Sequence, residues 1–311
     1  MIRTMKPVRA MLLAMAGSPS WKKLLTGWGV THRVVARFVP GETLDEALAA
    51  VRELNARGLS ATLNPLGENV TTAVEAAAAT DVYIEILERI AAERLECNVS
   101  VKLTVMGLDL GDEVAAGNLC RVLEVAASHG NFVRIDMESS AYVDRTLEVW
   151  RRAHERFPAV GAVIQSYLRR STEDLERLVA DGAALRIVKG AYAESSEIAF
   201  ADKREVDAAY LRFLERLARP DARASGVRVA VATHDPAMLE RGRQLIDEHA
   251  LVGWEFQMLY GIGTALQREL SEAGYAVRVY VSYGPSWYAW FMRRLAERPA
   301  NLGFFLRHLL P

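Results

Sequence analysis

Nine polar side chains stand at or just beyond the ends of short apolar segments that recur along the chain. They are Lys102, Asp136, Gln165, Arg186, Lys189, Thr233, His234, Gln257 and Tyr280. If these segments are parallel strands, their carboxyl ends meet at one edge of the sheet, where such folds build their active sites. Buried charges there must be paired or must bind a ligand. The nine together predict a shared polar site, although a single residue of this kind is more often only solvated or paired.

A second candidate binding feature is the adjacent pair Arg293 and Arg294, which lies in an aromatic-rich segment near the C-terminus. The planar fork of arginine binds a carboxylate through two parallel hydrogen bonds. Arg293 also stands four residues before Glu297, a spacing that stabilises an exposed helix by about 0.3 kcal/mol. The spacing therefore fits a carboxylate-binding pair and an ordinary packing helix equally well.

Eight apolar segments, each followed by a polar helix-forming stretch, must position these side chains. The segments are residues 61–66, 99–105, 132–137, 160–167, 185–188, 227–232, 254–259 and 277–281. Alternating strands and helices favour a parallel sheet, and eight units in about 250 residues is the number of a (β/α)8 barrel. A doubly wound open sheet is the alternative.

The alternation within the segments favours the barrel. In residues 99–104 the odd positions are apolar and the even positions are small or polar. A parallel strand covered by helices on both faces would be apolar on both. A barrel strand packs only one face against helices, so polar groups can gather on the other.

The N-terminal residues predict a helical segment, 1–58, that packs on a barrel domain of residues 59–311. Thr43 followed by Glu46 predicts a capping box at the start of one of its helices. The expected fold is thus an α/β, distorted (β/α)8 TIM-type barrel with N-terminal helices and a final helix over the active site.

Composition and motifs exclude several classes of function. The 38 basic and 39 acidic side chains nearly cancel, which gives no sign of a nucleic-acid partner. The two cysteines, Cys97 and Cys120, are too few for a disulfide framework and fit a reducing compartment. The chain has no phosphate-binding P-loop and no HExxH or CxxC motif, and its six histidines are scattered, so we expect no metal site. No stretch approaches the roughly 20 apolar residues of a membrane span, and a cytoplasmic protein is expected.

Eight motifs, in order and over nearly the whole chain, resemble those of proline dehydrogenases of the monofunctional bacterial type. They are Val-Ser-Val-Lys102-Leu, Arg-Ile-Asp136-Met-Glu, Gln165-Ser-Tyr-Leu, Leu-Arg186-Ile-Val-Lys189-Gly-Ala-Tyr192, Ala-Thr233-His234-Asp, Glu-Phe-Gln-Met-Leu259-Tyr-Gly, Arg-Val-Tyr280 and Tyr-Ala-Trp-Phe-Met-Arg293-Arg294-Leu-Ala-Glu297-Arg-Pro. Eight collinear motifs are far more specific than any one of them.

The resemblance implies the reaction and the partners. A non-covalently bound FAD would accept a hydride from L-proline, giving 1-pyrroline-5-carboxylate in the first step of proline catabolism to glutamate. A membrane quinone would reoxidise the flavin. This implies peripheral contact with the inner face of the membrane, and the N-terminal helices are candidates for a homo-oligomer interface.

The resemblance also implies roles for individual residues. Asp136 and Arg186 would be catalytic, with Asp136 supporting Lys102 and Arg186 beside the flavin N5 edge. The proline-binding residues would be Lys102, Leu259, Tyr260, Tyr280, Arg293 and Arg294. The FAD-binding residues would be Met137, Gln165, Arg186, Lys189, Gly190, Ala191, Thr233 and His234. Glu68 would pair with Arg293 as a gate that closes over the substrate.

Four positions depart from the family pattern: Asn64 and Pro65 in the first strand, Ala193 where a bulkier residue is common, and Ser282 where proline is common. None belongs to the expected proline-binding set. Ala193 would loosen the wall of the flavin site, and Asn64 and Pro65 would alter the geometry of the gate.

Two other functions remain as alternatives. A Schiff-base aldolase on the same barrel would use Lys102 or Lys189 as its nucleophile, with the amine pKa lowered by desolvation or by neighbouring cations. The other alternative is a non-catalytic barrel that binds an amino acid or a protein partner. The presence of both arginines together with Lys102 and Asp136 argues against it.

Overall fold

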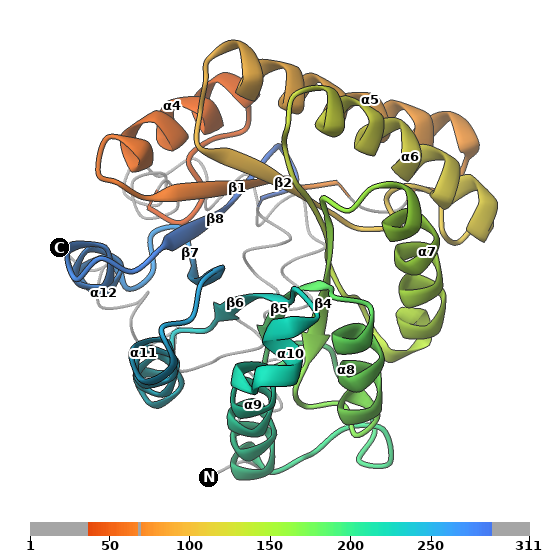
Figure 1. Cartoon of the computed structure of the whole chain (residues 1–311). Coiled ribbons are helices and arrows are strands. Elements are labelled where there is room, and N and C mark those ends of the chain that lie inside the picture. The colour runs from red at the N-terminus through yellow and green to blue at the C-terminus, as the bar shows by residue number, and fades with distance from the viewer. Residues whose placement is uncertain (1–36, 68–69, 288–311) are drawn as a thin grey trace, which may run out of the picture.

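The computed structural model describes residues 37–67 and 70–287 of the 311-residue chain. Within them, eight parallel strands form a closed barrel in chain order (Figure 1). The strands are β1 Ser60–Pro65, β2 Cys97–Val101, β3 Val133–Ile135, β4 Val160–Gln165, β5 Ala184–Val188, β6 Arg228–Ala232, β7 Trp254–Leu259 and β8 Val277–Tyr283. β8 closes the barrel by pairing with β1 from Ser60 opposite Arg278 to Pro65 opposite Tyr283. Closure confirms the predicted barrel and excludes the open sheet.

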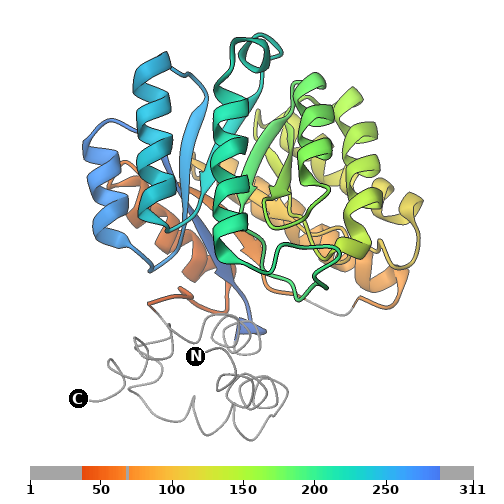
Figure 2. The same ribbon diagram turned by 90° about the horizontal axis from the view of Figure 1, so that it is seen from below.

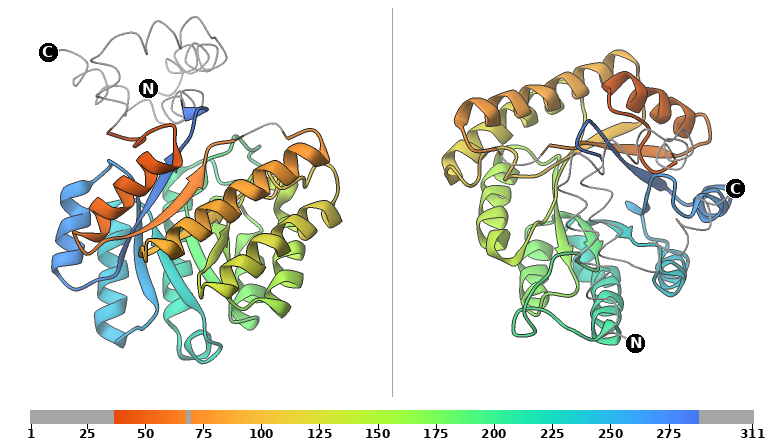
Figure 3. Two further views of the ribbon diagram at one scale, coloured as in Figure 1. Left: turned by 90° about the horizontal axis from the view of Figure 1, so that it is seen from above. Right: turned by 180° about the vertical axis from the view of Figure 1, so that it is seen from behind.

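Helices form the outer layer around the strands, as the views in Figures 2 and 3 show. They are α4 Leu44–Asn55, α5 Ala73–Ala92, α6 Asp112–Ser128, α7 Val143–Arg156, α8 Ser171–Ala180, α9 Lys203–Ala218, α10 Pro220–Ala224, α11 Pro236–His249 and α12 Thr264–Glu272, with a short 3-10 turn at Ser140–Tyr142. Of these, α4 precedes the first strand and packs against β1 and β8. None of the helices in the described part of the chain is long and apolar enough to cross a membrane.

The first described helix begins where the sequence predicts. The Thr43 hydroxyl accepts a hydrogen bond from the Glu46 backbone, while the Glu46 carboxylate accepts one from the Thr43 backbone. This confirmed capping box satisfies donors that a helix start otherwise leaves unpaired. The division of the chain into residues 1–58 and 59–311 stays a prediction, because residues 1–36 and 288–311 lie outside the described residues.

The two faces of each strand lie in different surroundings. Outward-facing side chains such as Val99 and Val101 are fully buried in the apolar core between strands and helices. The opposite face carries buried polar side chains, among them Ser100 and Arg186. The alternation of apolar and polar residues in 99–104 thus arises, as expected, because one face of the strand packs on helices and the other faces the barrel interior. The structure ends β2 at Val101, however, and not at 105 as the apolar pattern predicts.

Candidate active site

Asp136, one residue beyond β3, is the point on which polar side chains from three other strands converge. Its Oδ1 accepts hydrogen bonds from Arg186 Nη1 at 2.6 Å and from Ser100 Oγ at 2.7 Å. Its Oδ2 accepts one from the Tyr280 hydroxyl at 2.6 Å. The donors come from β5, β2 and β8, so barrel closure itself assembles the cluster. Three of the nine predicted strand-end residues therefore lie in direct contact.

The surroundings keep this carboxyl group ionised. Burial alone would raise the pKa of Asp136, but the charges of Arg186 and Lys102, with the hydrogen bonds from Tyr280 and Ser100, outweigh it and lower that pKa below its usual value. Burial and the Asp136 charge raise the pKa of Tyr280 well above its usual value. The two shifts together favour a protonated Tyr280 that donates to an ionised Asp136.

The Arg186 guanidinium is held from several directions. Besides its contact with Asp136, its Nε donates to Gln257 Oε1 at 2.5 Å. Its Cζ lies 5.1 Å from the centroid of the Tyr280 ring, close enough for a cation–π contact. Only 5% of its side chain is exposed, against 16% for Asp136. The Arg186 cation is thus fixed on the buried side of the cluster, whereas the Asp136 carboxylate is still partly exposed.

Glu138 is a residue of this region that the sequence analysis missed. It is buried, and its carboxylate accepts hydrogen bonds from the Thr104 backbone at 3.2 Å and the Thr104 hydroxyl at 2.7 Å. Burial raises its pKa despite these bonds. Thr104 lies two residues after Lys102, so Glu138 anchors the turn that carries the lysine. Its spacing from Asp136 was the available signal, since alternate residues of an extended segment point the same way.

Gln165, the last residue of β4, combines a fixed amide with an open acceptor. Its Nε2 lies 3.2 Å from the Glu138 carbonyl and 3.4 Å from the Met137 carbonyl, to which it donates. Its Oε1 is buried and has no hydrogen-bond partner within residues 37–67 and 70–287. Because buried polar atoms are rarely left unpaired, this oxygen suits a donor from a ligand.

Lys189, just after β5, contacts two carboxylates. Its Nζ lies 2.6 Å from both Asp207 on α9 and Asp235, which caps α11. Burial alone would raise the pKa values of both aspartates, but the charges and hydrogen bonds of Lys189 and Lys203 lower these pKa values below their usual range. The Lys189 ammonium therefore joins the N-terminal parts of α9 and α11.

Gly190 follows with a left-handed φ of +107°, and a Cβ there would lie 2.0 Å from Tyr167 Cδ1. Only glycine lets the backbone turn so close to this ring. Next to it, Ala191 is exposed.

The remaining predicted residues of the described chain lie around the same mouth of the barrel. His234 Nε2 accepts from the Leu259 backbone at 3.1 Å, joining the ends of β6 and β7. The Thr233 hydroxyl accepts from the Asp235 backbone at 3.1 Å. Tyr260 is half-buried, and its backbone donates to the Tyr280 carbonyl at 3.0 Å.

Three predicted residues, Glu68, Arg293 and Arg294, lie outside the described residues. Their roles in the gate and in carboxylate binding stay predictions. Among the departures from the family pattern, Asn64 is buried and faces the Tyr83 hydroxyl at 3.5 Å, while Ala193 is exposed.

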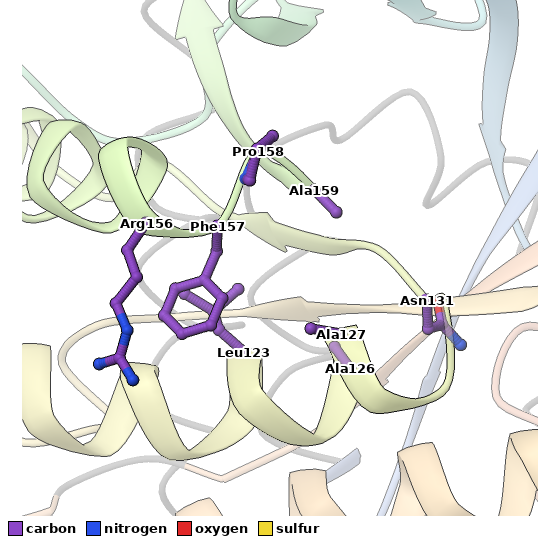
Figure 4. Close-up of a pocket in the computed structure, with 8 residues that line it drawn as sticks. All are labelled: Leu123, Ala126, Ala127, Asn131, Arg156, Phe157, Pro158 and Ala159. Atoms are coloured by element: carbon purple, nitrogen blue, oxygen red, sulfur yellow. The ribbon is translucent and has the colours of Figure 1, made fainter.

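A separate pocket lies on the outside of the barrel, between α6 and the connection from α7 to β4 (Figure 4). Its lining is largely apolar, with Leu123, Ala126 and Phe157 on its walls. None of the predicted site residues lines it. It is therefore unconnected with the polar cluster.

Comparison with known proteins identifies the family and agrees with the fold. The family model described as proline dehydrogenase matches residues 47–307. Proline dehydrogenase 1 of Bacillus subtilis (strain 168) is 39% identical over 305 residues, which cover 97% of this chain and 99% of that protein. Proline dehydrogenase of Deinococcus radiodurans is 37% identical over 281 residues, covering 88% of this chain and 89% of that protein.

A solved structure shows the same fold. Proline utilization A from Bdellovibrio bacteriovorus, inactivated by N-propargylglycine, superposes with a TM-score of 0.78 at 27% identity. The match covers 85% of this chain and 32% of that one. This chain thus spans about a third of the larger protein, and only that part of it is comparable.

Proposed function

The chain belongs to the proline dehydrogenase family, and we propose that it oxidises L-proline to 1-pyrroline-5-carboxylate with non-covalently bound FAD as the hydride acceptor. The observation that carries the proposal is the cluster in which Arg186, Tyr280 and Ser100 converge on Asp136 at the carboxyl ends of the strands. In barrels of this type that end of the strands is where catalysis takes place.

The described residues fit a flavin at this mouth. The unpaired Gln165 Oε1 is an acceptor suited to a ring N–H, and its orientation is fixed because Nε2 is already used. The tight turn at Gly190 brings backbone close to the same region. Arg186 supplies a fixed cation, which favours the negative charge that a flavin gains on reduction. We assign FAD binding to these three residues with Met137, Lys189, Ala191, Thr233 and His234.

FAD supplies the redox chemistry, since it accepts the hydride that leaves the proline carbon beside the ring nitrogen. The chain's own contribution is position and charge. We propose that Lys102, Arg293 and Arg294 bind the proline carboxylate and that Leu259, Tyr260 and Tyr280 enclose the ring. A carboxylate held by cations fixes which carbon faces the acceptor.

The substrate amine sets the pH dependence in this proposal. Hydride leaves readily only when the ring nitrogen has lost a proton and can donate its lone pair to the new C=N bond. Asp136 does not titrate in that range, because its pKa lies below its usual value. Activity should therefore rise from neutral towards alkaline pH as the substrate amine loses its proton.

Closure and reoxidation complete the proposal. Ion pairing of Glu68 with Arg293 would exclude water once proline is bound, which is a gating step and not chemistry. Electrons would pass from the flavin to a quinone at the inner face of the membrane, by peripheral contact. The N-terminal helices are proposed as a homo-oligomer interface.

Product analysis tests the proposal. The protein is incubated with L-proline, FAD and an artificial electron acceptor, and the cyclic imine product is trapped and quantified, with D-proline as the control. We expect product from L-proline only. Arg294→Lys should raise the proline KM strongly while flavin stays bound, because a point charge replaces a two-pronged donor. A flavin-loaded protein that forms no imine from L-proline would overturn the assignment.

The aldolase alternative is less consistent with the contacts. Lys189 Nζ donates hydrogen bonds to two carboxylates at 2.6 Å, so its position is fixed by those partners and not by a substrate carbonyl. Borohydride traps an enzyme-bound imine covalently, so a trapped adduct at Lys102 or Lys189 during turnover would favour the aldolase.

A further inference from the structure

A chain of hydrogen bonds runs from Arg186 away from the open mouth and into the barrel. Arg186 Nε donates to Gln257 Oε1 at 2.5 Å, and Gln257 Nε2 donates to Glu255 Oε1. Gln257 and Glu255 are alternate residues of β7, so both side chains point into the barrel. Of the three residues in these two contacts, only Arg186 has a role in the proposed reaction.

The charges at its two ends decide how the Gln257 amide is oriented. The amide lies between the Arg186 cation and the Glu255 anion. One orientation gives the cation an oxygen acceptor and the anion an N–H donor. The reverse would face N–H groups with a guanidinium, which has only donors, and an oxygen with a carboxylate, which has only acceptors. Glu255 therefore compels Gln257 to present its oxygen to Arg186.

The far end of the chain is anchored to the closure of the barrel. Arg278 Nε lies 3.1 and 3.0 Å from the two oxygens of Glu255. Arg278 Nη1 donates to the Ala61 carbonyl on β1 at 2.8 Å, and Gln257 pairs in register with Arg278. The Glu255 carboxylate is thus held in place by β8, which is itself fastened to β1.

The Gln257 contact restricts a motion that Asp136 alone would permit. Arg186 meets Asp136 and Ser100 through one nitrogen, Nη1. A planar group held at one corner can pivot about that corner, whereas a second bond at Nε, across the plane, fixes its direction. Only 5% of Gln257 is exposed, so water would not readily replace its oxygen as the acceptor for Arg186 Nε.

We propose that Gln257 and Glu255 are positioning residues of the reaction: Gln257 fixes the plane of the Arg186 guanidinium, and Glu255 fixes the orientation of Gln257. This inference rests on the proposed function, in which Arg186 lies beside the flavin. It assigns a role to a pair of side chains on β7 to which the proposed reaction gives no direct contact with substrate or cofactor.

The test compares Gln257→Met, Glu255→Gln, their double variant and wild type. Glu269→Gln is the matched control, since it alters an exposed glutamate on α12 that pairs with Arg243 at 3.2 Å. Three quantities are measured: the rate of anaerobic flavin reduction at saturating L-proline, the proline dissociation constant, and the midpoint potential of the bound flavin without proline.

We expect Gln257→Met to slow flavin reduction roughly tenfold, as small displacements of a positioned group do. The proline dissociation constant should change less than about twofold, and the midpoint potential should fall. Glu255→Gln should have a smaller effect in the same direction. The double variant should equal Gln257→Met alone, because residues that act in series are not additive. Glu269→Gln should match wild type.

A rescue keeps the proposal falsifiable if Gln257→Met does not fold. Exchanging the two residues, Glu255→Gln with Gln257→Glu, keeps an acceptor facing Arg186 and a donor–acceptor pair along β7, so flavin reduction should stay within about threefold of wild type. An unchanged rate and potential in Glu255→Gln and Gln257→Met, additive effects, or an exchange variant as slow as Gln257→Met would overturn it. A wild-type flavin that L-proline does not reduce would instead refute the proposed function.

Discussion

The two ends of the barrel interior use buried arginines in opposite ways. Near the carboxyl ends of the strands, Arg186 meets the Asp136 carboxylate at 2.6 Å, and the Asp136 side chain is 16% exposed. Deeper in the barrel, Arg134 on β3 is 5% exposed and donates to the backbone carbonyls of Ala162 and Ala184 at 3.1 and 2.5 Å. Its Cζ lies 4.8 Å from the centroid of the Phe132 ring.

The difference lies in what each cation is free to do. Arg134 links β3 to β4 and β5 through backbone oxygens, and burial with neighbouring arginines lowers its pKa. Its hydrogen-bond donors thus hold neighbouring strands of the barrel together. Arg186 and Tyr280 converge on a carboxylate at an edge that is still accessible. The same residue type thus joins strands at one end and, in the proposed function, organises chemistry at the other, the end where barrels of this type carry their active sites.

The largest effect is expected at the open end, from Asp136→Asn. The amide keeps the shape but loses the charge that pairs with Arg186, so flavin reduction by proline should fall about a hundredfold. Asp174→Asn is the control, because Asp174 is a buried aspartate on α8 that pairs with Arg170 at 2.7 Å. It should lower stability and leave kinetics unchanged. Stopped-flow measurement of flavin reduction and thermal denaturation separate the kinetic effect from the stability effect. Equal kinetic losses in Asp136→Asn and Asp174→Asn would contradict a special role for Asp136.

At the deeper end, Gly161→Ala should cost stability and not catalysis. A Cβ there would lie 2.5 Å from Arg134 Nη1 and 2.7 Å from the Ala184 carbonyl. Overpacking of this kind costs about 1–3 kcal/mol in the free energy of unfolding. Gly117→Ala, on α6 with no atom within 4 Å of the added Cβ, should stabilise by about 0.5–1 kcal/mol. Urea unfolding measures both, and a changed proline KM in Gly161→Ala would contradict this division.

Tyr280→Phe sharpens the comparison with a smaller change. It removes the 2.6 Å hydrogen bond to Asp136 and keeps the ring. Loss of a bond to a charged acceptor predicts a drop of about tenfold in kcat/KM. Tyr210→Phe, on α9, removes a 2.9 Å bond to the Ile187 carbonyl of β5 and should alter only stability. Steady-state kinetics decide, and identical behaviour of the two variants would count against a role for the Tyr280 hydroxyl.

The smallest effect is a pH dependence of stability that involves Lys189. Asp207 and Asp235 have lowered pKa values in the folded state, so their contribution is present above the usual carboxyl pKa of about 3.9 and is lost as pH falls through their folded pKa values. Lys189→Met removes one of the two lysines that contact both aspartates and leaves Lys203 in place, so it should destabilise by only about 0.5–1 kcal/mol at pH 7. The difference from wild type should shrink below about pH 4. A difference independent of pH in urea unfolding would show that packing, not charge, is responsible.

The strands were predictable from sequence because their pattern is local, whereas much of the site was not. Val99 and Val101 alternate with polar residues, and this pattern identified β2. Leu103 and Val105 continue the alternation, yet the chain turns after Val101, and Glu138, from beyond the next strand, accepts hydrogen bonds from Thr104 within that turn.

Partner choice across the barrel depends on register and closure. Asp136, Arg186 and Tyr280 could each be named from their places at strand ends, but not their mutual contacts. The chain through Gln257 and Glu255 depends on how β7 and β8 pair. Single-strand patterns carry no such information, since side-chain alternation along one strand is compatible with several registers of its neighbour.

The most direct test of the whole account is the visible absorption spectrum of the purified protein before and after L-proline is added without oxygen. We expect a flavin band that L-proline bleaches and D-proline leaves unchanged. A flavin band that persists with L-proline would keep the fold and the cofactor but contradict the substrate. A colourless protein that FAD does not restore would contradict the dehydrogenase mechanism itself.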